Sequence, residues 1–174
     1  YFSDVFVNRR PPESVATDPV LVGECLGGAM YTEDFRRMLA KCGCQDFRLV
    51  ASSEITSTDP QILKKIGNAR FFSKTIRAFN LPLEDRCEDY GEVAYYLGTM
   101  DHRETGYALD DHHYFETGKA LPICSNTADM ILKTRLAKHF KVVGNRKSHY
   151  GLFDCGPINS TSGNAATQNG GACC

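Results

Sequence analysis

Eight cysteines are the residues with the clearest capacity for chemistry in this chain. Cys25 stands out because it lies in the stretch Gly23-Glu24-Cys25-Leu26-Gly27-Gly28, where glycines on both sides allow a tight turn and leave the sulfur approachable. A thiolate at such a position can serve as a nucleophile or as a ligand for a soft ion. The alternative is an inert loop cysteine, and spacing alone does not separate the two, because free cysteines often only fill space. Cys25 is therefore the best candidate ligand or nucleophile in the chain.

A second candidate site is the adjacent pair Cys173 and Cys174, at the glycine-rich end of the sequence. Adjacent thiols can capture a soft metal or metalloid, or they can simply oxidise. Cys42 and Cys44 are separated by one residue, which is too few for the Cys-x2-Cys spacing of zinc sites, so we expect them to pack at the end of a helix. The remaining cysteines are solitary in the sequence, and we interpret them as structural: Cys87, Cys124 and Cys155.

Histidines and acids cluster between Asp110 and Lys119, in a pattern that resembles a metal site at first sight. Consecutive residues of an extended segment point to opposite faces, so His112 and His113 are poorly placed to share one ion. We therefore expect a polar edge whose side chains bond to neighbouring loops.

Composition and charge limit the possible partners. The 174 residues include 20 Lys and Arg against 21 Asp and Glu, for a net charge of -1, so nothing indicates a surface that coats nucleic acid or anionic lipid. No apolar run approaches the length of a membrane span, no signal-peptide pattern opens the sequence, and the glycine-rich loops of nucleotide sites are absent. We expect a cytoplasmic protein with reduced thiols and with neither nucleic-acid nor membrane partners.

The pattern of apolar residues predicts an α+β fold, a mixed sheet with flanking helices. The clearest helix is 32–41, for which Thr32 is the expected cap, and another is expected from Ala128 to His139, capped by Asn126 or Thr127. A short helix should follow the Asp18-Pro19 pair, and one more should cover 61–67. Expected strands include 1–7, 46–55, 69–79, 92–97, 114–115, 121–124, 141–143 and 150–153. Residues 156–174 are poor in apolar side chains, so we expect an irregular, mobile tail.

Several of these stretches, in this order, resemble the arsenite methyltransferases that use S-adenosylmethionine. The resemblance is sharpest over residues 1–80. It is carried by Tyr1-Phe2-Ser3-Asp4-Val5-Phe6, by Gly23 to Ala29, by Asp34-Phe35-Arg36-Arg37, by Ala69 to Thr75 and by the paired cysteines near the end.

The resemblance implies that this chain is the C-terminal half of such an enzyme. Residues 1–83 would form the end of a Rossmann-like methyltransferase sheet with the arsenic-binding region, 84–155 a small C-terminal α+β domain, and 156–174 the tail. A chain that starts with Tyr1, inside an expected strand and without Met, fits a missing N-terminal cofactor domain. S-adenosylmethionine would serve the complete enzyme, and we do not expect it to bind this chain alone.

The family pattern further implies that Cys25 is one arsenic ligand and a catalytic residue, with its partner thiols upstream of this chain. Trivalent arsenic is soft and binds thiolates, which leaves a lone pair to attack the sulfonium methyl group. A thiol reductant would keep the ligands in the thiol form. One ligand cannot hold arsenic tightly, so the chain alone is expected to be inactive. The alternative is a non-catalytic, thiol-rich module that binds soft metals through Cys25 and the Cys173-Cys174 pair.

Overall fold

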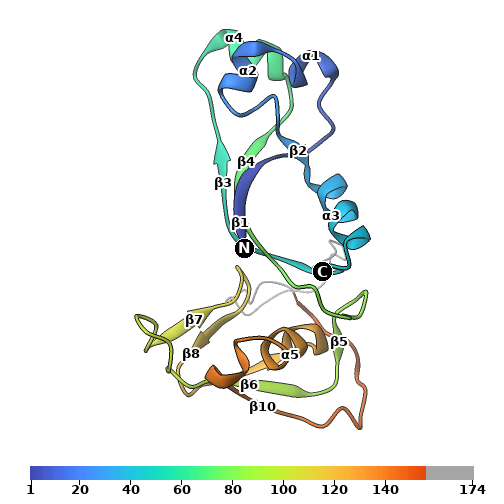
Figure 1. Cartoon of the computed structure of the whole chain (residues 1–174), viewed down its shortest axis with the longest axis vertical. Coiled ribbons are helices and arrows are strands. Elements are labelled where there is room, and N and C mark those ends of the chain that lie inside the picture. The colour runs from blue at the N-terminus through green and yellow to red at the C-terminus, as the bar shows by residue number, and fades with distance from the viewer. Residues whose placement is uncertain (156–174) are drawn as a thin grey trace, which may run out of the picture. The chain divides into compact units, whose positions relative to one another are not determined.

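The computed structural model describes residues 1–155, and the chain divides into two compact units after Ala78. The sequence predicts the boundary between the two domains after Leu83. Each unit has its own strands and its own buried apolar residues, and each is described by itself below (Figure 1).

Unit 1 is built on a four-stranded mixed sheet with the order β2-β1-β4-β3. Its strands are β1 (Phe2–Val7), β2 (Met30–Tyr31), β3 (Phe47–Ile55) and β4 (Phe71–Ala78). β4 runs antiparallel to both β1 and β3, whereas β2 joins β1 in parallel at Phe6 and Val7 alone. Beyond these two residues, β1 has no strand neighbour on its outer side within residues 1–155.

The helices of unit 1 cover the sheet in two separate groups. Figure 1 shows α1 (Glu13–Ala16), α2 (Pro19–Gly23) and α4 (Pro60–Ile66) gathered at one end of the strands, and α3 (Thr32–Lys41) apart from them. The first group packs on a core of Val7, Val15, Leu21, Leu26, Ala29, Ile62 and Phe71. α3 packs on a second core through Phe35, whose ring meets those of Phe2, Phe6 and Phe47 edge to face.

The described part of unit 2, residues 79–155, consists of short strands around the α-helix α5. A sheet of order β10-β6-β9 is formed by β6 (Glu92–Tyr96), β9 (Ala120–Ile123) and β10 (Phe140–Val143). Two strand pairs accompany it, β5 (Glu88–Asp89) with β11 (Gly151–Leu152) and β7 (Gly106–Ala108) with β8 (Tyr114–Glu116). The helix α5 (Ser125–Leu132) and the 3-10 turn at Ala137–His139 cover the core.

The expected α+β class with a mixed sheet is confirmed, and so are the strands expected at 1–7, 46–55 and 69–79. Two helix caps differ from expectation. α3 already includes Thr32, whose hydroxyl instead accepts a hydrogen bond from Lys74 Nζ at 3.1 Å, and Tyr31 takes the cap position. α5 begins at Ser125 with Cys124 as its cap, and it ends at Leu132 rather than at His139.

The correction to α5 has a local cause. The Thr134 hydroxyl donates to the Met130 carbonyl at 2.6 Å and accepts from the Leu136 backbone N–H at 3.2 Å, so it occupies groups that a continuing helix would use. The tail expected at 156–174 lies outside the described residues. Within residues 1–155, no helix combines the length and apolar character needed to cross a membrane.

Neighbouring residues of α5 provide a test of the core of unit 2. Ile131 is fully buried, whereas Leu132 beside it is 46% exposed. Ile131→Ala should lower the free energy of unfolding by about 2–5 kcal/mol, because it leaves a cavity in a packed core. Leu132→Ala should change it by about 0.5 kcal/mol or less. Urea unfolding followed by circular dichroism would measure both, and equal losses would contradict the assigned core.

Candidate functional site

The turn that carries Cys25 begins with a well-capped helix. The Asp18 carboxylate accepts hydrogen bonds from the backbone N–H groups of Val20 at 3.0 Å and Leu21 at 3.2 Å, and Pro19 occupies the first helical position. Lys65 of α4 lies 2.7 Å from the same carboxylate. Its hydrogen bond, together with those from the backbone, holds the pKa of Asp18 below its usual value. The start of α2 is therefore fixed both locally and to α4.

The end of α2 forces Cys25 into an unusual backbone conformation. Cys25 has φ of 62°, in the left-handed region that favours glycine. The N–H groups of Leu26 and Gly27 both reach back to the Leu21 carbonyl at 2.8 Å, which closes the helix end. Leu26 then enters the core at 4% exposure, while Cys25 stays at the surface as a free thiol.

Gly27 explains part of the glycine pattern around the cysteine. A Cβ atom at Gly27 would lie 2.7 Å from Val22 Cγ2 and 3.0 Å from the Val22 backbone N. A side chain at Gly28 or Gly23 would meet nothing within 4 Å. Gly27 is thus the position where the turn packs directly on α2, and this contact fixes the backbone that presents Cys25.

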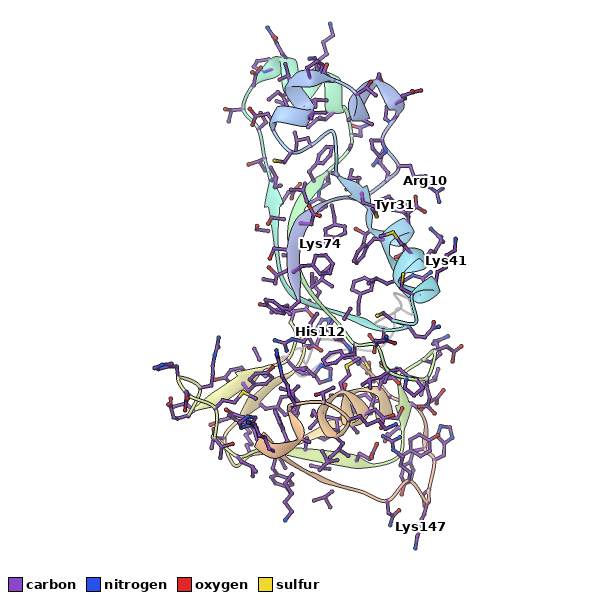
Figure 2. The ribbon with its side chains drawn as sticks, viewed as in Figure 1. Arg10, Tyr31, Lys41, Lys74, His112 and Lys147 are labelled. Carbon is purple, nitrogen blue, oxygen red and sulfur yellow. The ribbon has the colours of Figure 1, made fainter. Side chains whose placement is uncertain are left out.

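The chain after the turn is anchored to the sheet and to α3. Ala29 is buried, and Tyr31 pairs with Val7 of β1. Arg10 lies over the Tyr31 ring at 5.6 Å and binds both carboxylate oxygens of Asp34 at 2.5 Å, which lowers the pKa of that carboxyl group. Figure 2 shows Arg10 and Tyr31 next to each other at the start of α3. Both ends of the Cys25 turn are therefore held in place.

The other cysteines of unit 1 lie elsewhere in the fold. Cys42 is the C-terminal cap of α3 and is exposed, so it does not fill the core, and Cys44 is half-buried. Cys173 and Cys174 lie outside the described residues.

The two histidines make separate contacts, as their alternation in sequence predicts. His113 is buried, and its Nδ1 lies 2.8 and 2.9 Å from the two carboxylate oxygens of Asp110. Its ring stacks on Phe115. His112 is partly exposed and lies 3.6 Å from Asp111. The pattern is that of a structural polar cluster.

Sequence reasoning missed a group of three buried cysteines in unit 2. The sulfur atoms of Cys87, Cys124 and Cys155 all lie within 4.8 Å of one another. They form the one such group of potential metal ligands found among residues 1–155. Cys87 is disulfide-bonded, which departs from the expectation of reduced thiols, whereas Cys124 and Cys155 are thiols. Each residue is solitary in the sequence, so no spacing motif predicts that the three cysteines lie close together.

Comparisons with known proteins agree on one family. No protein-family model matches the chain. An arsenite methyltransferase of Aquipseudomonas alcaligenes is 43% identical over 176 residues, which cover 100% of this chain and 51% of that protein. The arsenite methyltransferase of Rattus norvegicus is 35% identical over 143 residues, covering 80% of this chain and 37% of the rat protein.

A solved structure shares the fold. The chain matches the crystal structure of CrArsM, an arsenic(III) S-adenosylmethionine methyltransferase from Chlamydomonas reinhardtii, with a TM-score of 0.82 and 48% identity. The match covers 88% of this chain and 52% of that one. The chain therefore spans about half the length of the Aquipseudomonas alcaligenes protein and of CrArsM.

The close approach at Gly27 generates a first prediction for this site. Gly27→Ala should lower the free energy of unfolding by about 1–3 kcal/mol, because its Cβ meets the Val22 backbone. Gly28→Ala is the matched control. The added Cβ atom would meet nothing within 4 Å, so this substitution should leave the free energy of unfolding unchanged or raise it by up to about 1 kcal/mol. Thermal unfolding of the two variants would show whether the turn is packed as described.

The left-handed conformation of Cys25 generates a second prediction. Cys25→Gly should raise the free energy of unfolding by about 0.5–1 kcal/mol, because glycine adopts this φ without strain. Cys25→Ser keeps the strain and should leave stability unchanged. Denaturant unfolding of the three proteins would measure the difference. A Cys25→Gly variant that is less stable than the Ser variant would contradict the strained conformation.

Proposed function

We propose that this chain, which is homologous to the arsenite methyltransferases over its whole length, is the C-terminal half of such an enzyme. In this proposal the thiolate of Cys25 is one ligand of trivalent arsenic. The observation that carries it is the turn itself, in which an exposed cysteine is held in a strained, left-handed conformation by contacts on both sides.

Strain at Cys25 supports a functional role over an inert one. A surface cysteine with no packing role gains nothing from a left-handed backbone, where glycine would be more stable. A fixed turn, in contrast, holds the sulfur in one direction and limits the reorganisation needed when a ligand binds. Exposure of the thiol lets it meet arsenic and the further thiols that a pyramidal site requires.

The chemistry that the complete enzyme would perform is a methyl transfer. When bound in the complete enzyme, S-adenosylmethionine would supply the methyl group, with an As–C bond formed in place of an S–C bond whose electron pair stays on the sulfonium sulfur. The contribution of this chain is to hold arsenic at a defined position through Cys25. A thiol reductant would be needed to keep the ligand cysteines reduced.

The cofactor domain and the remaining arsenic ligands are proposed to lie in an N-terminal part that this chain does not contain. The outer side of β1 supports this arrangement, because only Phe6 and Val7 pair there within the described residues. A further strand could continue the sheet along Phe2 to Val5, where backbone groups of an edge strand face outward. We accordingly propose that S-adenosylmethionine binds the complete enzyme and not this chain alone.

We further propose a cytoplasmic role in arsenic detoxification, without nucleic-acid or membrane partners. The near-zero net charge supports the absence of nucleic-acid binding. The second candidate function is a non-catalytic module that binds soft metals, and the buried group of Cys87, Cys124 and Cys155 favours it specifically. The two functions differ in whether methylation by the complete enzyme requires Cys25.

The test compares Cys25→Ser with Cys42→Ser in the complete enzyme. Both cysteines are exposed thiols at helix ends, so the second variant controls for the general loss of a surface thiol. Cys25→Ser should lower the methylation rate by at least about 10³-fold, because the substrate loses a covalent anchor and its alignment. Cys42→Ser should leave the rate unchanged. Methylated arsenic would be measured by chromatography with mass-spectrometric detection.

Full activity of Cys25→Ser would overturn the assignment. Arsenite titration of the reduced chain with Cys124 and Cys155 replaced by serine isolates the contribution of Cys25. Weak binding that is lost on adding Cys25→Ser supports the methyltransferase site. The metal-binding module is supported only if the complete enzyme with Cys25→Ser keeps its full methylation rate.

A further inference from the structure

The buried group of Cys87, Cys124 and Cys155 has the composition of a binding site for a thiophilic ion. The three sulfurs lie within 4.8 Å of one another, and the residues are 5%, 0% and 9% exposed. The aromatic ring of Phe153 packs against them. Sulfurs that converge this closely from three separate segments could share one ion after small side-chain rotations.

The fold holds the segment before Cys87 against the start of α5. Asn126, which is 1% exposed, donates from its Nδ2 to the Glu84 carbonyl and accepts from the Glu84 N–H, both at 2.9 Å. The Ser125 hydroxyl also donates to the Glu84 carboxylate. This clamp brings Cys87 beside Cys124, the residue that caps the helix.

The pairing of β5 with β11 positions Cys155, the third cysteine of the group. The Phe153 N–H donates to the Cys87 carbonyl at 2.8 Å, so the two segments run alongside each other up to the cluster. Cys155 follows two residues later and is buried. The three sulfurs are therefore gathered by backbone pairing and by a buried amide, not by a local motif.

The sulfur of Cys124 is held at the start of α5 by Thr127. Its Sγ accepts the Thr127 N–H at 3.4 Å and lies 3.2 Å from the Thr127 hydroxyl. The cap position therefore fixes the place of the Cys124 sulfur within the group.

We propose that Cys87, Cys124 and Cys155 form a binding site for trivalent arsenic that is separate from Cys25. Arsenous acid would react with three thiols to form three As–S bonds. The three sulfur-bound protons leave with the three hydroxyl groups of arsenous acid as three water molecules, and no electrons are transferred. Cys87 must first be released from its disulfide by a thiol or phosphine reductant, which is itself oxidised by two electrons.

Charge balance favours arsenic over zinc at this site. Three thiolates neutralise one trivalent ion, whereas with zinc they would leave a net negative charge in a buried, apolar setting. The choice of arsenic also rests on the proposed function, which makes arsenic the substrate of this family.

The experiment uses the full chain in a background that retains only these three cysteines. Cys25, Cys42, Cys44, Cys173 and Cys174 are replaced by serine, so neither the proposed methylation site nor the terminal pair can contribute. After reduction with a phosphine and desalting, the protein is titrated with arsenite. Bound arsenic is measured by mass spectrometry, and its sulfur neighbours are counted by X-ray absorption. We expect one arsenic atom per chain, bound by three sulfurs.

Cys124→Ser in the same background is the informative variant. Serine is a preferred helix cap, so the fold should persist while the sulfur is lost. Its affinity for arsenite should fall by at least tenfold, with two sulfurs around the arsenic that remains. Cys155→Ser should give the same result, and circular dichroism would confirm that both variants are folded.

Three outcomes would overturn the proposal: no arsenic bound to the reduced background protein, binding unchanged in both serine variants, or displacement of arsenic by an equimolar amount of Zn²⁺. These outcomes are independent of the methylation assay, because Cys25 is absent here. A failed titration would leave the role of Cys25 intact, and loss of that role would not affect this one.

Discussion

The antiparallel pairing of β1 with β4 is the interaction on which unit 1 depends. Consecutive residues of a strand face opposite sides of a sheet. Phe6 and Val7 therefore point to opposite faces of β1, and each belongs to a different apolar core. Phe6 contacts Phe35 of α3, whereas Val7 lies in the core that receives Leu21 and Leu26. The same two residues pair with β2. One short segment of strand thus positions both α3 and the turn that carries Cys25.

The first turn of α5 has the corresponding role in unit 2. Arg146 binds the carboxylates of Glu92 and Asp129 and donates to the Ser125 carbonyl, which ties the helix to β6. Asn126 satisfies the backbone of Glu84 on the other side. Buried polar groups are costly unless they are paired, so these bonds specify one position for the helix. Because Cys124 caps α5, the same bonds also fix the position of its sulfur.

The two candidate sites differ in how they are organised. Cys25 is exposed and strained, on a turn that packs on α2 through Gly27, and in the proposed function it would bind arsenic together with thiols from outside this chain. The three cysteines of unit 2 are buried and come from separate segments of one unit. An exposed thiol suits a substrate that must meet a second reactant. A buried group of thiols suits an ion that is held away from solvent.

The amino-acid sequence determined the features that depend on near neighbours. The Asp18-Pro19 start of α2, the main strands of unit 1 and the glycine-flanked turn at Cys25 were all predictable, because caps, alternation and turns are set by residues within a few positions. The resemblance to the arsenite methyltransferases could also be recognised from the sequence, and the homologues confirm it.

Only the tertiary structure decided the left-handed conformation of Cys25, the early end of α5 and the meeting of Cys87, Cys124 and Cys155. Each of these depends on contacts between segments or on competing local hydrogen bonds. The pairing of β5 with β11 and the clamp by Asn126 join residues that are far apart in the chain, and no local pattern encodes such contacts.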